Sequence, residues 1–225
     1  MSINTVSKIE GPVRVNNVLV SVFDKDGLEE LIPSMVSING DVTFYSTGGT
    51  YNKIEEILGK DAAKHLVSVS DYTGQPEMQG GLVKTLDFKI YLGLLSESYN
   101  EAHGEDLDRT GAVKFDMVVV NLYPFKETVA KPDATIEDAR GNIDIGGPCM
   151  LRAAAKNFLR VLPACDPGDY QMMLEELKSS NGVVSLETRY HAAKKAFSHT
   201  AEYDTAVARF LAERAINELA EIYTT

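Results

Sequence analysis

The stretch Met117-Val118-Val119-Val120-Asn121 decides the fold, because it is an uninterrupted apolar run that ends in a polar residue. A β-branched run of this kind is typical of a central parallel strand that helices cover on both faces. Ligands of such sheets bind at the carboxyl ends of the strands. The stretch therefore predicts an α/β protein with a ligand crevice beside Asn121.

Further short apolar runs alternate with helical stretches, which is the order of a βαβ protein. Strands are also expected at Val18–Val22, Val42–Tyr45, Leu66–Val69 and Lys89–Leu95, and a further apolar stretch, Val161–Cys165, precedes the last of the helices named below. Helices are expected at about Gly27–Val36, Tyr51–Leu58 and Pro167–Lys178, with Asp166 as the N-cap of the last, and through most of the remainder. We expect one domain over residues 1–225, with a sheet core at about 18–165 and a helical extension at about 166–225 packed on it.

The composition excludes several classes of function. The net charge is −11 and the basic residues are dispersed, so no nucleic acid is expected as a partner. No segment stays apolar long enough to span a bilayer, so no membrane contact is expected and the cytoplasm is the expected compartment. Cys149 and Cys165 are not spaced as a metal or disulfide framework, and no metal site is expected.

The stretch Asn142-Ile143-Asp144-Ile145-Gly146-Gly147-Pro148 precedes a helix that continues through an alanine-rich segment to Lys156. The two glycines let the main chain approach a ligand, and proline suits the first helical turn. Lys156 follows about two turns beyond Pro148 on the same expected face. We expect a carboxylate and a lysine to act together on an anion. The alternative is that Asp144 only caps the helix while Lys156 is solvated.

Two further loops suit a phosphate. Ser46-Thr47-Gly48-Gly49-Thr50 lies between a predicted strand and a predicted helix, where free main-chain N–H groups and the helix dipole favour an anion. Phe23-Asp24-Lys25-Asp26-Gly27 follows the first strand, so Lys25 is expected at the same edge of the sheet. The alternative for the first loop is a tight connection without a ligand.

The segments Glu77–Leu86 and Asn121–Phe125 add polar groups to the same expected crevice. In the first, glycines permit close approach, and Lys84 and Thr85 supply an ammonium and a hydroxyl group. In the second, Asn121 and Tyr123 place an amide and a phenol at the end of the central strand. The alternatives are a surface turn for the first segment and loop-holding side chains for the second.

These segments together resemble one family, the IMP cyclohydrolase domain that forms the N-terminal half of the bifunctional AICAR transformylase/IMP cyclohydrolase. The resemblance covers the chain from about Val18 to Leu211. Its motifs are Ser46–Thr50, Ser70–Gly74, Pro76–Met78, Val83–Leu86, Val120–Phe125, Asn142–Gly147, Leu151–Asn157, Phe197–Ala201 and Tyr203-Asp204. So many matches in the same order are hard to obtain by chance.

The resemblance implies a methylglyoxal-synthase-like α/β fold, in which helices flank a parallel sheet and additional helices follow at the C-terminus. It also implies an enzyme, a cyclohydrolase run in the ring-closing direction. The substrate would be a phosphorylated purine ribotide, FAICAR, which loses water to form IMP in the last step of de novo purine biosynthesis. Neither a cofactor nor a metal is implied.

Site residues are carried over from the family position by position. The implied substrate-binding residues are Asp24, Lys25, Thr47, Gly48, Gly49, Thr50, Val83, Thr85, Asn121, Ile145 and Gly146. The implied catalytic residues are Lys84, Tyr123, Asp144 and Lys156. Lys156, poised with Asp144, is expected to transfer the proton. Lys84 is expected to stabilise negative charge on oxygen, and Tyr123 to orient the amide or relay a proton.

The chain departs from the family's usual pattern at several positions expected near the ligand. The family usually has serine at Phe23, threonine at Asp26, arginine at Leu82, histidine-proline at Asp87-Phe88, and histidine at Tyr91 and Phe158. Loss of one charge-assisted hydrogen bond at Leu82 costs about 1.5–3 kcal/mol, which weakens a site without abolishing it. The changes leave open an altered substrate or a lost activity.

Three functions compete: the cyclohydrolase, a methylglyoxal-synthase-like lyase, and a non-catalytic module that binds a purine nucleotide or phosphate effector. The segment Asp144–Asn157 and the terminal helices are cyclohydrolase features, so they favour the cyclohydrolase over the other two functions. No transformylase segment follows Thr225 in the sequence, so formylation is expected from a separate AICAR transformylase of the same pathway. The chain is expected to stand alone, and the alternative is that it is a piece of a longer protein. Because related bifunctional proteins dimerise, a homodimer is a candidate assembly.

Overall fold

The computed structural model describes residues 5–76, 78 and 84–223 of the chain. Their main sheet is five-stranded and parallel, with the order β4-β3-β2-β5-β6, and β1 pairs with β7 in a small antiparallel sheet. The strands are β1 (Val13–Arg14), β2 (Asn17–Val22), β3 (Thr43–Ser46), β4 (Leu66–Ser68), β5 (Met117–Asn121), β6 (Leu162–Ala164) and β7 (Val183–Val184). The predicted α/β class is confirmed.

Helices connect the parallel strands, as crossovers between parallel strands require. The α-helices up to β5 are α1 (Leu28–Ile38), α2 (Gly48–Leu58), α3 (Ala62–His65), α4 (Val69–Thr73), α5 (Phe88–Leu95) and α6 (Glu101–Thr110). Those after β5 are α7 (Phe125–Val129), α8 (Ile136–Gly141), α9 (Gly146–Lys156), α10 (Tyr170–Ser179), α11 (Leu186–Ala212) and α12 (Ile216–Ile222).

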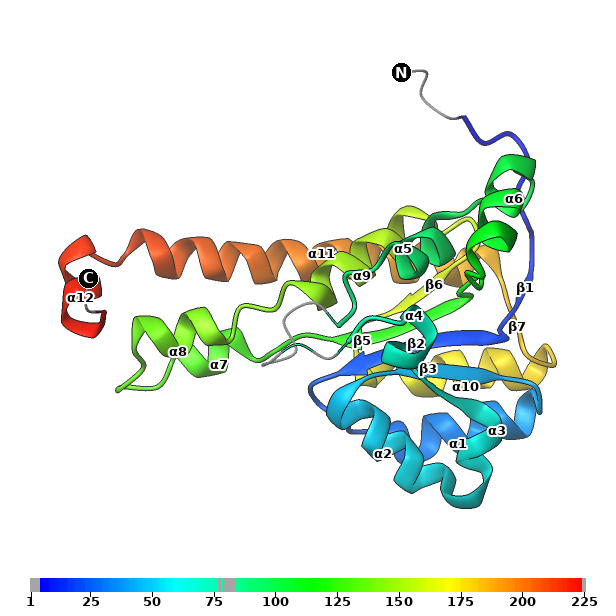
Figure 1. Ribbon diagram of the computed structural model, residues 1–225, viewed down its shortest axis with the longest axis horizontal. Helices are drawn as coiled ribbons and strands as arrows, with labels where there is room; N and C mark the ends of the chain where they lie inside the picture. The colour runs from blue at the N-terminus through cyan, green and yellow to red at the C-terminus, as the bar shows by residue number, and fades with distance from the viewer. Residues whose placement is uncertain (1–4, 77, 79–83, 224–225) are drawn as a thin grey trace.

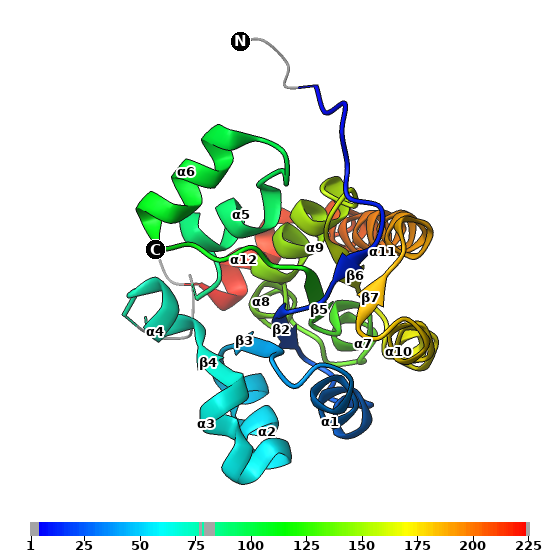
Figure 2. The ribbon, with the colours of Figure 1, turned by 90° about the vertical axis from the view of Figure 1, so that its right-hand side faces the viewer.

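The sheet is covered on both faces, and each face has its own hydrophobic core. In Figures 1 and 2, α1, α2 and α10 lie on one face, while α5, α9 and α11 lie on the other. Alternation along β5 divides its side chains, so that Met117 and Val119 join the first core and Val118 and Val120 join the second. The apolar run of β5 therefore has the central, doubly covered place that its composition predicts.

One segment was predicted wrongly, because Lys89–Leu95 was expected to be a strand and lies within α5. Asp87 begins this helix, and its carboxylate accepts a hydrogen bond from the main-chain N–H of Lys89 at 2.8 Å. Ile90 and Leu94, four residues apart, are both fully buried in the second core. An N-terminal cap and helical spacing of the buried positions therefore outweigh the strand propensity of the run.

Other boundaries differ by a few residues from those expected. Helix α1 continues through Pro33 to Ile38, and α2 begins at Gly48 rather than at Tyr51. The expected N-cap at Asp166 is present, since its carboxylate accepts from the N–H of Gly168 at 2.9 Å. This cap begins a short 3-10 turn, Pro167–Asp169, that leads into α10.

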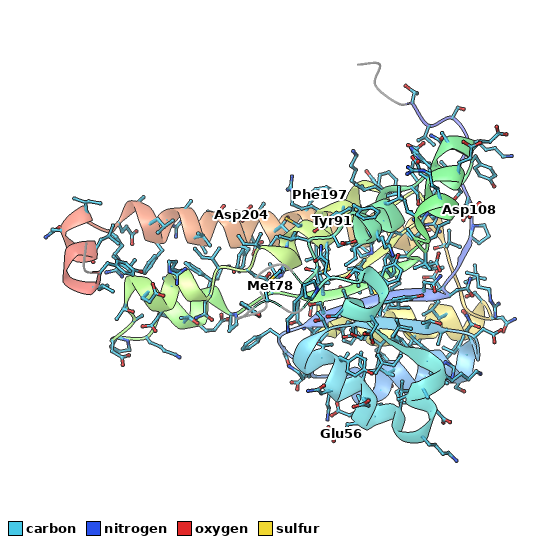
Figure 3. All side chains as sticks on the ribbon, in the orientation of Figure 1. Glu56, Met78, Tyr91, Asp108, Phe197 and Asp204 are labelled. Carbon is cyan, nitrogen blue, oxygen red and sulfur yellow. The ribbon has the colours of Figure 1, made fainter. Side chains whose placement is uncertain are left out.

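Helix α11 is the long element of the C-terminal part. Its first half packs against α9 and β6, and its second half projects beyond the sheet together with α7, α8 and α12 (Figure 1). Asp204 is labelled on this projecting half, whereas Glu56 lies on α2 at the opposite side of the molecule (Figure 3). None of the helices among the described residues has both the length and the hydropathy to cross a membrane.

A fully buried arginine ties α11 to the rest of the molecule. Arg189 has no exposed surface, and its guanidinium group makes five hydrogen bonds of 2.8–3.0 Å to main-chain carbonyls. The acceptors belong to Glu10, Gly11, Phe158, Leu159 and Val184. The burial of this cation is therefore offset by saturation of its donors, and one side chain joins the N-terminal segment, the end of α9 and β7.

Replacing Arg189 by methionine should lower the free energy of unfolding by about 3 kcal/mol or more, because buried carbonyls lose their donor. Urea denaturation followed by circular dichroism measures the change. Arg209→Met is the matched control, since this arginine lies on the same helix and is exposed. The control should change stability by less than about 0.5 kcal/mol, and equal effects of the two substitutions would contradict the anchoring role of Arg189.

Candidate functional site

Two adjoining cavities lie at the carboxyl ends of β2 and β5. The smaller has a volume of 250 Å³ and is lined by the loop after β2, Thr47, Lys84–Leu86 and the first turn of α9. The larger, of 830 Å³, extends from the same β2 loop to α7 and α11. Phe23, Asn121 and Tyr123 line both and form the wall between them. The structure thus has a hollow at the edge of the sheet where the sequence predicts a crevice.

Asp144 lies at the start of α9 and lines the smaller cavity. Its carboxylate oxygen Oδ1 accepts a hydrogen bond from the main-chain N–H of Gly147 at 2.8 Å. Burial raises the pKa of this carboxyl group, and the N–H groups of Gly147 and Tyr123 partly oppose the shift. Asp144 therefore accepts a hydrogen bond from the first turn of α9, whose N-cap residue is Ile145, and it also faces the cavity with a perturbed pKa.

The first turn of α9 packs so closely that its two glycines have no room for a side chain. A Cβ atom on Gly146 would lie 2.5 Å from Oγ1 of Thr85. A Cβ atom on Gly147 would lie 2.6 Å from a methyl carbon of Leu122 and 2.7 Å from Oδ2 of Asp144. These contacts bring the Lys84–Thr85 segment, β5 and α9 together around one wall of the cavity.

The loop Thr47–Gly49 provides a candidate phosphate site at the start of α2. Gly48 has φ = 56°, a left-handed conformation that favours glycine. A Cβ atom on Gly48 would lie 3.6 Å from Nζ of Lys84, and one on Gly49 would lie 4.0 Å from Nζ of Lys25. Oγ1 of Thr47 is shielded from solvent and has no hydrogen-bond partner among the described residues. Two ammonium groups, a hydroxyl and a helix N-terminus thus surround a small space suited to an anion.

Thr50 and Asn121, both expected to bind substrate, instead use most of their hydrogen-bonding groups within the protein. Oγ1 of Thr50 accepts from the N–H of Val22 at 3.1 Å and donates to its carbonyl at 2.9 Å. Oδ1 of Asn121 accepts from the N–H groups of Phe23 and Asp24, and Nδ2 donates to the carbonyl of Asp24. Both side chains hold the end of β2 and the loop after it, and Asn121 still lines both cavities.

The remaining predicted residues lie around the rim. The rings of Phe23 and Tyr123 meet edge to face at 5.6 Å between centroids, and each is about half exposed. Ile145 is exposed at the mouth of the smaller cavity, whereas Asp24 and Lys25 line the larger one. The carboxylate of Asp24 accepts from the N–H of Asp26 within its own loop.

Lys156 lies on α9 but is not among the residues that line the smaller cavity with Asp144, and its joint action with Asp144 stays a prediction. Lys156 is the last residue of α9, so its Cα atom lies about 15 Å along the axis from that of Gly146. Its side chain is exposed, whereas Pro148 is buried. Residues spaced by whole turns share a face of a helix and are also separated along its axis, so Lys156 lies at the opposite end of α9 from the first turn, which lines the smaller cavity.

Several departures from the family pattern have local structural roles. Asp87 caps α5 and accepts a second hydrogen bond from Nε2 of Gln75 at 2.9 Å. Phe158 packs against the ring of Tyr190 at 5.1 Å between centroids. Tyr91, labelled in Figure 3, lies on α5, and burial raises the pKa of its hydroxyl. Leu82, and Val83 of the predicted substrate-binding set, lie outside the described residues.

The chemistry available at the site is that of acid and base groups and hydrogen-bond donors. No group of three or more His, Cys, Asp or Glu side chains that suits a metal ion occurs in the described part of the chain. The groups that do converge are the carboxylate of Asp144, the ammonium group of Lys84, the hydroxyl of Thr85 and the N-terminus of α9. This set can accept a proton and stabilise an oxyanion.

Comparison with known proteins gives the family. The model of the MGS-like domain matches residues 27–149, and that of the AICARFT/IMPCHase bienzyme matches residues 154–225. The crystal structure of ForH superimposes with a TM-score of 0.71 at 32% identity, covering 86% of this chain and 97% of ForH. The chain belongs to the MGS-like domain family. It continues beyond that domain into a segment that matches part of the bienzyme.

The curated relatives of this MGS-like protein are much longer than the chain. The bifunctional purine biosynthesis protein PurH of Nostoc punctiforme is 47% identical over 193 residues, which are 86% of this chain and 36% of that protein. PurH of Leptospira biflexa serovar Patoc is 44% identical over 202 residues, or 90% of this chain and 38% of the relative. The chain thus spans a little over a third of the length of these relatives, and it aligns with their N-terminal portion.

The sequence did not indicate two contacts that shape the site of this MGS-like protein. The hydroxyl of Tyr203 on α11 accepts from the N–H of Asp144 at 2.8 Å and donates to the carbonyl of Asn142 at 2.9 Å. Thr85 is buried against Gly146 instead of lying free in a loop. Tyr203 stands in a family motif, which is the one signal in the sequence that marks it.

Gly147→Ala should destabilise the protein by about 1–3 kcal/mol, because the new methyl group overlaps both Leu122 and the carboxylate of Asp144. Thermal and urea unfolding measure the effect. Gly104→Ala is the matched control: it also adds a methyl group to a helical glycine, and no atom lies within 4 Å of the new position. The control should stabilise by about 0.5–1 kcal/mol, and a neutral Gly147→Ala would show that this packing is less tight than described.

Proposed function

We propose that this protein is an IMP cyclohydrolase, which closes FAICAR to IMP with loss of water. The observation that carries the proposal is the convergence of Asp144, Lys84, Thr85 and the N-terminus of α9 on one cavity beside a candidate phosphate loop. The match of residues 154–225 to the AICARFT/IMPCHase bienzyme supports the cyclohydrolase over a lyase with an MGS-like domain alone.

The two ends of the crevice suit the two ends of a ribotide. We assign the phosphate to the start of α2, where Thr47, Lys25 and Lys84 surround the main chain of the glycine turn. The heterocycle then lies toward Asp144 and Ile145, over the carboxyl ends of β2 and β5. Phe23 and Tyr123 bound this half of the cavity with two exposed rings.

Ring closure joins the carboxamide nitrogen to the formyl carbon of the same molecule. The carboxamide NH₂ group attacks, the electron pair of the formyl C=O bond moves to oxygen, and one N–H proton is released. The oxyanion takes up one proton to become a hydroxyl group, which leaves as water with a second proton when the formamido nitrogen loses its hydrogen and a C=N bond forms. Because the reacting atoms belong to one substrate, holding them in contact provides much of the acceleration.

The residues of the smaller cavity suit these steps. Asp144 accepts the proton from the attacking nitrogen, and its pKa, raised by burial, makes it a stronger base than an exposed aspartate. Lys84 and the N–H groups at the start of α9 stabilise the negative charge that develops on the formyl oxygen. Tyr123, at the wall between the cavities, orients the carboxamide.

The proposed activity also suggests a cellular compartment, a pathway partner and an assembly. We propose that the protein acts in the cytoplasm, where the unpaired thiols of Cys149 and Cys165 remain reduced. Curated relatives are bifunctional, and we propose that an AICAR transformylase supplies the formylated substrate. A homodimer is the assembly we propose, and sedimentation of the purified chain tests it.

The direct test is conversion of FAICAR by metal-free protein, followed by the ultraviolet absorbance of IMP. Asp144→Asn and Lys84→Met should each lower kcat by about 10²–10³-fold, since each removes a group that acts on the reacting atoms. Lys178→Met is the control for loss of a lysine, because Lys178 is exposed on α10. It should leave turnover unchanged, and a wild-type protein that binds IMP but forms none would instead support a nucleotide-binding module.

On the acid limb of the rate profile, kcat should begin to fall at a higher pH than the pKa of an ordinary aspartate would give. As a base, Asp144 must be ionised, so kcat falls as the pH falls through its pKa, which burial raises above the ordinary value of about 3.9. Steady-state rates at saturating FAICAR between pH 4 and about pH 9 measure this limb. The residual rate of Asp144→Asn should lack it, and an unchanged limb in that variant would assign the titration to another group.

A further inference from the structure

The hydroxyl of Tyr203 reaches from the C-terminal helical part to the loop that carries Asp144. It accepts a hydrogen bond from the N–H of Asp144 at 2.8 Å and donates one to the carbonyl of Asn142 at 2.9 Å. One side-chain atom thus bridges both ends of the short connection between α8 and α9. Tyr203 lies on α11 next to Asp204, which Figure 3 labels on the helix.

Burial and a ring contact hold the side chain that carries this hydroxyl. Tyr203 is 7% exposed, and its ring meets that of Phe125 at 6.1 Å between centroids. Phe125 begins α7 and is itself buried in the second core. Burial also raises the pKa of the Tyr203 hydroxyl, so it stays protonated and keeps its hydrogen to donate. The helix, the ring contact and the protonation state therefore hold the bridge in one geometry.

Asp144 is held at both its main chain and its side chain. Tyr203 fixes the main-chain N–H, while the N–H of Gly147 fixes the carboxylate oxygen Oδ1 at 2.8 Å. The second oxygen, Oδ2, is the one near the smaller cavity's glycine wall, 2.7 Å from the place of a Cβ on Gly147. Rotation of the peptide before Asp144 would move this carboxylate relative to the reacting atoms, because the side chain is attached to the main chain that Tyr203 holds.

We propose that Tyr203 is a positioning residue for the ring-closing reaction, which holds the Asp144 carboxylate at the substrate through its bridge to the Asn142–Asp144 main chain. The inference rests on the proposed function, because it gives Asp144 the role of base. It assigns a catalytic purpose to the helical extension: α11 sets the geometry of a site whose other walls come from the sheet core. A misplacement of about 1 Å can cost about 10²-fold in rate, so one hydroxyl is enough to matter.

Tyr203→Phe tests the bridge, because it removes the hydroxyl and keeps the ring against Phe125. We expect kcat for FAICAR closure to fall by about 10- to 100-fold with KM within about twofold, since the lost interaction orients the base and does not touch the substrate. Tyr72→Phe is the matched control. Its hydroxyl also accepts from one main-chain N–H, that of Val113 at 3.0 Å, and its ring also packs edge to face, but it lies outside both cavities.

Amide hydrogen exchange provides a readout that does not depend on turnover. Exchange at the Asp144 amide should accelerate at least tenfold in Tyr203→Phe and remain unchanged in Tyr72→Phe. Unaltered exchange at Asp144, or equal losses of kcat in the two variants, would overturn the inference while leaving the cyclohydrolase proposal intact. A wild-type protein without FAICAR closure would overturn the proposed function, and the catalytic purpose of the bridge with it.

Discussion

The pairing of β2 with β5 is the constraint on which the site depends. These strands are far apart in the sequence, and their register sets Val18 opposite Met117 and Val22 opposite Asn121. Asn121 therefore emerges beside the loop after β2 and binds its main chain through both atoms of its amide. Shifting this register would separate the loop with Lys25 from the wall that contains Tyr123, and the two cavities would lose the boundary between them.

The sheet and its crevice could be predicted because their signals are local. Apolar runs of strand length and glycine-rich turns locate β2, β3 and β5, and parallel topology places their ends at one edge. The apolar residues of Lys89–Leu95 suit either a strand or a helix, so the composition of the segment does not decide its state. Its helix is decided by the cap at Asp87 and by burial of Ile90 and Leu94 against the rest of the second core.

The candidate site also contains features that local motifs predict and features that they do not. The loop at Gly48, the carboxylate of Asp144 and the donor at Lys84 follow from motifs, and the structure brings them around one hollow. The spacing also places Lys156 on α9, and the structure has it at the end of the helix away from this hollow. Tyr203 was missed because a hydrogen bond across 59 residues of sequence obeys no spacing rule.

Helix α11 is anchored at two positions along its length. Arg189 binds the N-terminal segment, and Tyr203 binds the loop that contains Asp144. Their separation of about 21 Å is fixed by the helical rise, and each residue between them also sets about 100° of rotation. Substitutions on the exposed face of α11 leave both anchors in place. A single insertion or deletion between the two anchors, in contrast, would turn one of them about 100° away from its partners.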